Sequence, residues 1–356
     1  MTAIAVLGVI AFAQAAFLAL LLVFLGVRRS YGRSRRAALA AGRAGLVAPL
    51  RDWLVAGGHV TGVVSALRSL PAASVVEYTL LLVRSMVPPE RRAELAESLR
   101  DEPWVRRAVA GAGSRLWWTR IEAARALSIV GTSEDRLIVQ RLLEDEQPEV
   151  AIAAVACLPR VANADIINRE LDRFATLTPM LRQYLLATLR EVPDLVDPQL
   201  AARLRADAEP DALSWRVRLA AALEFPRALR AAVPLATHEN AAVRAAVARA
   251  LSRLPGDDSL RTLGTLLRDA DAGVREEAAA SLGALASPRA VPMLTISMRD
   301  PAWQVRRRAG LALAQLGEQG KQAVQVLRSD PDPYVASMAT LASGLTDGAL
   351  LALTEN

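Results

Sequence analysis

The side chains that carry most catalytic and metal chemistry are scarce in this 356-residue sequence, which has one cysteine and two histidines. Cys157 has no second cysteine with which to form a disulfide, and His59 and His238 are far apart in the sequence. These three residues cannot form a structural zinc site without several carboxylates. The sequence also lacks a Gly-rich phosphate loop and a nucleophile elbow. We therefore expect a protein that is not an enzyme and that holds no metal and no other cofactor.

Arginine and aspartate, in contrast, recur at regular positions. Successive segments share an anchor position, which is usually a valine, and in several of them an arginine directly follows it: Arg120, Arg182, Arg218, Arg244, Arg275 and Arg306. In four segments an aspartate stands five positions before the anchor: Asp145, Asp269, Asp300 and Asp330. Each arginine falls in the first turn of an expected helix, where the helix dipole disfavours a cation. We therefore interpret the two series as a structural ladder of Asp–Arg pairs between neighbouring repeats.

A groove for an acidic ligand is the alternative role of the same arginines. Ala151 and Ala336 interrupt the series, and a structural ladder tolerates such gaps better than a binding site does. Tryptophans are the second kind of candidate, because aromatic side chains anchor many protein interfaces. The candidate interface residues are Trp118, Trp215 and Trp303, and the alternative is that these rings fill the space between stacked repeats.

The elements that must position these residues are pairs of helices. Val243, Val274 and Val305 are 31 residues apart, and Val335 follows after 30. Each unit begins with an amphipathic segment, which a turn rich in Asp, Pro and Asn follows. After the turn, the valine begins a second segment that is rich in alanine at helical spacing. One such pair cannot bury its apolar face alone, so the pairs must stack. The sequence therefore predicts an all-α fold, an α-solenoid of about eight two-helix repeats over residues 114–345.

One repeat departs from this period. Val217 and Arg218 come five residues late, and the period recovers at Val243. The delay follows the stretch Glu209-Pro210-Asp211. We therefore interpret residues 209–211 as the site of an insertion.

The repeated pattern Asp-x-x-x-x-Val-Arg-x-x-Ala-Ala-x-Ala-Leu resembles the HEAT repeat, in the short form of the phycobilisome-lyase-type HEAT-like family. It is clearest at Asn240–Leu251, Asp271–Leu282 and Ala302–Leu313. The resemblance implies a HEAT-like α-solenoid, and such arrays usually bind other proteins. Together with the N-terminal segment, the chain is similar to membrane-anchored bacterial HEAT repeat domain-containing proteins.

Two further regions flank the repeats. Residues 50–113 are divided by glycines and prolines into helical segments that do not follow the period. We interpret them as a helical N-terminal cap of the array, and a spacer between membrane and array is the alternative. Residues 346–356 are a short C-terminal tail, the kind of end that is often frayed.

The N-terminal segment predicts a transmembrane helix over residues 3–27, which contain no charged residue. A helix of this length rises roughly 37 Å, and a hydrocarbon core is about 30 Å thick. A cleaved signal peptide is the alternative, but no Lys or Arg precedes the apolar run. An Arg-rich juxtamembrane segment follows at residues 28–49. Its basic collar consists of Arg28, Arg29, Arg33, Arg35 and Arg36.

The collar also predicts the orientation in the membrane. Positively charged flanks stay in the cytoplasm, so we expect a single-pass protein of the inner membrane with its N-terminus outside and its repeats in the cytoplasm. The same arginines can contact anionic lipid headgroups. The net charge of the chain is +6, which equals the six arginines of residues 1–50, a stretch without acidic residues. The remainder is balanced, and this argues against nucleic acid as a partner.

These features together predict a membrane-tethered cytoplasmic scaffold for protein–protein interaction. Its expected partners are the lipid bilayer and an unidentified, membrane-associated protein. The resemblance to membrane-anchored HEAT proteins suggests an accessory role in an envelope or exopolysaccharide glycosyltransferase system. The alternative that the resemblance implies is a bilin-lyase-like protein or another HEAT-repeat enzyme accessory factor.

Overall fold

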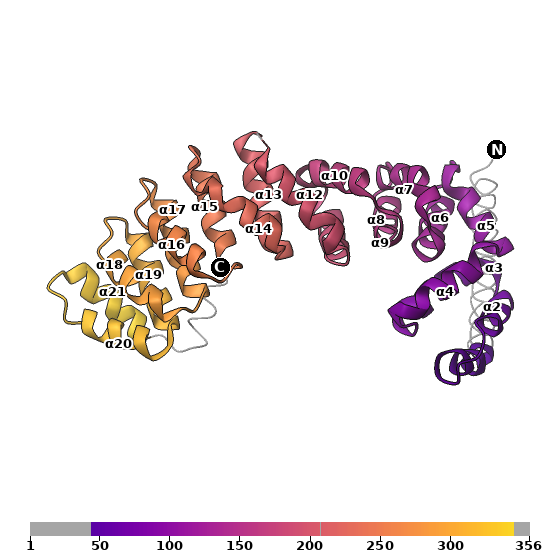
Figure 1. Ribbon diagram of the computed structural model, residues 1–356, viewed down its shortest axis with the longest axis horizontal. Coiled ribbons are helices and arrows are strands. Elements are labelled where there is room, and N and C mark those ends of the chain that lie inside the picture. The colour runs from indigo at the N-terminus through magenta and orange to yellow at the C-terminus, as the bar shows by residue number, and fades with distance from the viewer. Residues whose placement is uncertain (1–43, 207, 345–356) are drawn as a thin grey trace, which may run out of the picture. The chain divides into compact units, whose positions relative to one another are not determined.

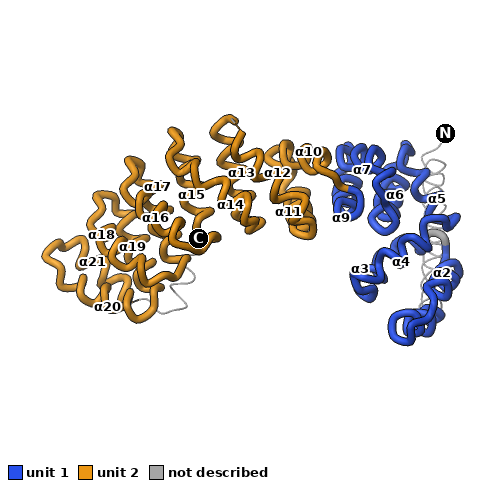
Figure 2. The backbone as a smooth tube through the Cα atoms, in the orientation of Figure 1, with its two compact units in different colours: residues 1–161 blue, residues 162–356 orange. Residues whose placement is uncertain are grey.

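The computed structural model describes residues 44–206 and 208–344, and every regular element in these ranges is a helix (Figure 1). The expected transmembrane helix, the basic collar and the tail 346–356 lie outside the described residues. Within the described ranges, no helix is both long enough and apolar enough to cross a membrane. The chain divides into two compact units, residues 1–161 and residues 162–356, which Figure 2 colours separately.

In unit 1, the helices before the repeats pack around an apolar core. A helix over residues 44–55 is followed by α2 (Thr61–Arg68), α3 (Ala72–Ser85), α4 (Pro89–Arg100) and α5 (Pro103–Ala110). Trp53 and Leu67 are fully buried in this core. Arg68 on α2 donates from two nitrogens to both carboxylate oxygens of Glu102, at 2.8 and 2.6 Å. Since Glu102 directly precedes α5, this pair ties α2 to the start of α5.

The first helices that follow the 31-residue period also belong to unit 1. They are α6 (Trp117–Val130), α7 (Arg136–Leu143), α8 (Pro148–Val155) and α9 (Leu158–Val161). α6 packs against α8, and α3, α4 and α5 pack against α6. The helices that precede the repeats therefore cover one side of the first repeat.

Unit 2 is an α-solenoid with two layers of helices (Figure 1). The alanine-rich layer contains α11 (Pro179–Leu189), α13 (Pro210–Leu223), α15 (Ala241–Leu251), α17 (Ala272–Ala284), α19 (Trp303–Gln315) and α21 (Pro333–Ser343). The other layer contains α10 (Ala164–Arg173), α12 (Pro193–Arg205), α14 (Pro226–Ala232), α16 (Asp257–Leu266), α18 (Val291–Ser297) and α20 (Gly317–Leu327). From α13 onward, each alanine-rich helix packs on the next.

Small side chains set the distance between the alanine-rich helices. Val243, Val274 and Val305 are fully buried between neighbouring repeats. At Gly283 on α17, an added Cβ would lie 2.8 Å from the Cβ of Ala312 on α19. Helices that meet through Ala and Gly approach to the short end of the usual 8–10 Å separation. The alanine content of the sequence is therefore a packing requirement of this layer.

The helix starts keep the 31-residue step through the segment in which an insertion was expected. α8, α11, α13 and α15 begin at Pro148, Pro179, Pro210 and Ala241. The interpretation of residues 209–211 as an insertion is therefore wrong. Pro210 begins α13 in phase, because proline is favoured in the first turn of a helix.

The late position of Val217 and Arg218 has a simple cause. Val243 is the third residue of α15, whereas Val217 lies much deeper in α13. Val217 is therefore not the counterpart of Val243, and Arg218 does not belong to the regular series of arginines. The residue of α13 that corresponds to Arg244 is Leu213, which is buried.

Candidate functional site

The repeated arginines and aspartates meet at the turns that precede the alanine-rich helices. Arg244 on α15 donates from Nε and Nη2 to the two carboxylate oxygens of Asp269, each at 2.7 Å. Arg275 on α17 makes the same two bonds to Asp300, at 2.7 and 2.9 Å. The arginine side chains are only 15% and 12% exposed, and the aspartates 9% and 8%. Each pair therefore joins one repeat to the next and is largely shielded from water. We call each such arginine and its acceptors a rung.

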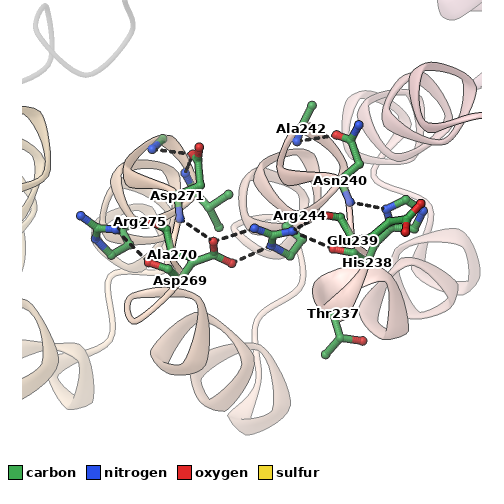
Figure 3. Close-up of polar contacts among 12 residues, drawn as sticks. Thr237, His238, Glu239, Asn240, Ala242, Arg244, Asp269, Ala270, Asp271 and Arg275 are labelled. Carbon is green, nitrogen blue, oxygen red and sulfur yellow. Dashed lines mark hydrogen bonds and ion pairs between the residues drawn. The ribbon is translucent and has the colours of Figure 1, made fainter.

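Each rung arginine also binds its own turn. Arg275 donates from Nη1 to the carbonyl oxygens of Asp269 and Ala270, at 2.8 and 3.0 Å. Arg244 makes equivalent bonds to the turn before α15. Asp269 thus accepts from Arg244 with its carboxylate and from Arg275 with its carbonyl, as Figure 3 shows. Consecutive rungs are therefore linked through the backbone of the turns.

The rung aspartates also fix the shape of these turns. Oδ1 of Asp269 accepts from the backbone N–H of Asp271 at 2.9 Å, which is the bond of an Asx turn. Asp271 in turn caps α17, because its carboxylate accepts from the N–H groups of Gly273 and Val274. The negative charges of Asp269 and Asp271 offset the unfavourable position of Arg275 near the N-terminus of α17.

The pKa values of the rung carboxylates follow from these bonds. The bond from Arg244 holds the pKa of Asp269 below its ordinary value, against the opposing effect of burial. Burial alone would raise the pKa of Asp300, but the bond from Arg275 and the N–H of Ala302 hold it below the ordinary value. Both groups are therefore charged in the folded state at neutral pH.

Unit 1 contains a rung of the same kind. Arg120 on α6 donates from Nε and Nη2 to Asp145 at 2.6 and 2.8 Å. Its Nη1 donates to the carbonyl of Ser114 at 3.0 Å. Burial would raise the pKa of Asp145, but the bonds from Arg120 and from the N–H of Gln147 keep it lowered. The same geometry therefore forms in both units.

The expected pair of Arg306 and Asp330 is absent. Arg306 donates from Nη1 to two carbonyls of its own turn, as the other rung arginines do. Asp330 instead accepts from Arg299. The cause is the repeat length: α19 begins at Trp303 and α21 at Pro333, one residue short of the usual step. The guanidinium of Arg306 lies over the ring of Tyr334, 5.3 Å from its centroid.

Arg182 has an aromatic neighbour as well. Its guanidinium lies over Trp215 of the next repeat at 5.4 Å, and Arg218 approaches the same ring at 5.7 Å. The residue that corresponds to Asp269 in this repeat is number 207, which lies outside the described residues. Trp215 thus lies between two arginines. We use the term turn edge for the turns that precede the alanine-rich helices together with the first residues of those helices.

The other candidate tryptophans lie at the starts of alanine-rich helices. Trp118 on α6 is 52% exposed and packs edge-to-face against Trp117. Trp303 on α19 is 55% exposed, and the guanidinium of Arg307 lies 5.4 Å from its centroid. These rings therefore do not fill the space between stacked repeats.

Two structural residues were missed by the sequence patterns. His238 takes the place of a rung aspartate, because its Nδ1 accepts from the N–H of Asn240 two residues on. Asp197 on α12 is buried, and its carboxylate accepts from the N–H groups of Arg227 and Ala228 at the start of α14. The 31-residue step from Asp269 indicates the position of His238, whereas no local pattern indicates Asp197.

Clusters of metal ligands, clefts and thiols are the other places in the described residues where chemistry could occur. The described residues contain no cluster of three or more His, Cys, Asp or Glu side chains that could hold a metal ion. A cleft of about 930 Å³ lies beside α16. Its carboxylates are paired, Asp257 with Arg289 and Asp258 with Arg261. Burial raises the pKa of the Cys157 thiol, so it is not a reactive thiolate.

The family of HEAT repeats matches residues 260–344. A comparison with curated proteins gives no match. Among solved structures, the chain is similar to an engineered protein at 18% identity, with 80% of this chain and 94% of that chain covered and a TM-score of 0.33. It is also similar to human deoxyhypusine hydroxylase in complex with glycerol at 18% identity, with coverages of 73% and 97% and a TM-score of 0.28.

Residues 260–344 thus resemble HEAT repeats. The helix starts from Trp117 to Ala241 follow the same 31-residue step, so the helical repeats of each unit are similar to HEAT repeats. Arrays of this kind are helical scaffolds that commonly mediate protein–protein interactions.

Proposed function

We propose that the chain is a membrane-tethered scaffold whose HEAT-like repeats bind a partner protein in the cytoplasm, at the inner membrane. The observation that carries this proposal is the turn edge of the repeats. In each unit, shielded Asp–Arg rungs hold the turns in place, and a tryptophan near them is more than half exposed: Trp118 in unit 1 and Trp303 in unit 2. A preorganised surface with exposed aromatic side chains loses little entropy when it binds.

The membrane tether rests on the sequence. The uncharged stretch of residues 3–27 is long enough to cross a bilayer. The five collar arginines after it favour a cytoplasmic repeat domain and contact with anionic headgroups. A partner held in this way is itself at the membrane, which is consistent with an accessory role beside an envelope or exopolysaccharide glycosyltransferase.

The experiment has two arms. Cell fractionation compares the full chain with a variant lacking residues 1–36: the full chain is expected in the membrane fraction, and the variant in the soluble fraction with unchanged helical circular dichroism. In-cell crosslinking of the full chain, followed by purification and mass spectrometry, is expected to recover one membrane-associated protein reproducibly. The double substitution Trp118→Ala, Trp303→Ala is the matched control and is expected to reduce that recovery. A full chain in the soluble fraction contradicts the tether, and recovery of no partner contradicts the scaffold.

A further inference from the structure

The rung at Arg306 lacks its carboxylate. In the rungs of Arg244 and Arg275, Nη1 binds the arginine's own turn, and Nε and Nη2 bind an aspartate of the next repeat. Arg306 makes the Nη1 bonds to Asp300 and Pro301, but its Nε has no hydrogen-bond partner. Within the described residues, no carboxylate pairs with this guanidinium. Arg306 is therefore held in the rung conformation with its carboxylate-binding nitrogens unused. We call it an open rung, and we call the rungs in which an aspartate is bound closed rungs.

The nearby acidic residues are already engaged. Asp300 binds Arg275, and Asp330 binds Arg299. Asp332 caps α21 by accepting from the N–H of Tyr334. None of these carboxylates is free to move to Arg306 without breaking a bond of its own, so a carboxylate for this rung must come from elsewhere.

Two exposed aromatic rings and a second cation lie on the first turns of α19 and α21, the two helices that bring Arg306 and Tyr334 together. Tyr334 and Trp303 are 68% and 55% exposed, and they lie at the starts of α21 and α19, which pack on each other. Arg307 lies over Trp303, and its Nε also lacks a hydrogen-bond partner. The site thus combines two guanidiniums without carboxylates and two rings that offer apolar surface.

We propose that the open rung at Arg306 binds an acidic segment of a partner protein. An Asp or Glu carboxylate of that segment accepts from Nε and Nη2 of Arg306, as Asp300 accepts from Arg275. The ring of Tyr334, which covers the guanidinium in the free protein, turns toward solvent to admit it. The residues that flank the carboxylate in the partner pack on Trp303 and Tyr334.

A protein carboxylate fits this site better than a phosphate group. The rungs of this chain bind carboxylates in a planar, two-bond geometry that matches the guanidinium. The rings beside Arg306 supply contacts that a free phosphate does not use. The inference takes from the proposed function only that the repeats bind a protein, and it is independent of the membrane tether.

The chain supplies its own test ligand. A peptide that copies residues 297–304 contains the turn around Asp300, and a second peptide with asparagine in place of Asp300 is the control ligand. Full-length protein in detergent is mixed with each peptide, and the transverse relaxation of the peptide NMR signals gives the bound fraction. We expect the aspartate peptide to bind in the millimolar range or tighter and the asparagine peptide to bind at least tenfold more weakly, which is about 1.4 kcal/mol.

Substitutions locate the binding. Arg306→Ala is expected to abolish the difference between the two peptides. Trp303→Ala, which changes an exposed side chain, and Arg307→Ala are expected to reduce binding several-fold. Arg261→Ala is the matched control, because Arg261 is an exposed arginine with its own carboxylate, and it is expected to bind as wild type. If Arg306→Ala does not fold by circular dichroism, the two flanking variants decide the question.

Three results would overturn the proposal. They are equal binding of both peptides to wild type, unchanged peptide binding by folded Arg306→Ala and by both flanking variants, and Arg306-dependent binding of inorganic phosphate without binding of the aspartate peptide. None of these results depends on membrane association or on crosslinked partners. A failure here is therefore distinguishable from a failure of the scaffold proposal.

Discussion

Arg275 and Arg306 occupy the same place in consecutive repeats, yet their partners differ. Arg275 is 12% exposed and binds Asp300 with two bonds. Arg306 lies over Tyr334, because the following repeat is one residue shorter and Asp330 binds Arg299 instead. A repeat array can therefore keep the same residue in successive units while the spacing to the next turn decides whether that residue holds the fold together or remains available to a ligand.

The largest expected effect comes from breaking a closed rung. Asp300→Ala leaves the shielded guanidinium of Arg275 without its carboxylate and removes the Asx turn at Ala302. The loss of one partner from such a pair costs about 2 to 3 kcal/mol. We expect this loss in thermal unfolding and in the hydrogen-exchange protection of α17 and α19, since repeat arrays open locally.

The matched control for Asp300→Ala is Asp258→Ala. The pair of Asp258 and Arg261 is about 80% exposed on both sides, and exposed pairs contribute up to about 1 kcal/mol. If the two variants lose equal stability, the closed rungs are not structural elements of the array, and the distinction between closed and open rungs fails.

Acid is expected to weaken the closed rungs together. The pKa values of Asp145, Asp269 and Asp300 are lowered in the folded protein. Their contribution to stability is therefore fully present above the unfolded pKa of about 3.9 and is lost as the pH falls through the lower folded values. Unfolding free energies measured between pH 2.5 and pH 6 are expected to fall below about pH 4.

Asp269→Asn tests whether the acid effect comes from the rungs. This variant is less stable at neutral pH, because asparagine pairs more weakly with Arg244, but it has one titrating rung fewer. Its stability is expected to depend less steeply on pH below about pH 4 than that of wild type. An unchanged slope would assign the acid sensitivity to other carboxylates.

Substitutions at two glycines, Gly283 and Gly310, test how closely the helices of these repeats pack. In Gly283→Ala, the new Cβ meets the backbone and Cβ of Ala312 at 3.0 and 2.8 Å, so α17 and α19 must move apart, at a cost of about 1 kcal/mol after the gain in helix propensity. At Gly310 the nearest atoms are flexible methionine side chains at 3.4 Å. Gly310→Ala is therefore expected to be neutral or slightly stabilising. Equal melting temperatures for the two variants would contradict this difference in packing.

The sequence was sufficient to predict the helical repeats and the chemistry of the closed rungs. A 31-residue step places an arginine and an aspartate at a fixed distance from each helix start, and stacking then brings Arg244 to Asp269. The phase of α13 was also available, since Pro148, Pro179 and Pro210 follow the same step. The Val-Arg pattern led to the wrong phase for α13, because Val217 and Arg218 form the same residue pair deeper in that helix.

Other contacts depend on three-dimensional detail that no spacing encodes. Asp330 has the expected position, but the shorter repeat brings it to Arg299 rather than to Arg306. In the sequence, Asp197 cannot be told from a carboxylate on the surface of α12. Only the packing of α14 against α12 buries it and brings its carboxylate to the N–H groups at the start of α14. The 30-residue step from Val305 to Val335 reveals the shorter repeat in the sequence, but only the packing decides which arginine Asp330 then binds.

The smallest expected difference is the one between two tryptophans, Trp215 and Trp303. Trp215 lies between the guanidiniums of Arg182 and Arg218, whereas in the described residues one guanidinium, that of Arg307, lies over the ring of Trp303. Cation–π contacts at exposed sites contribute about 0.5 to 1 kcal/mol each. Trp215→Ala is therefore expected to lower stability by about 1 kcal/mol, and Trp303→Ala by about half as much, in urea unfolding followed by circular dichroism. If Trp303→Ala has the larger effect, then Trp303 rather than Trp215 is the structural ring, and the turn edge around Arg306 belongs with the closed rungs.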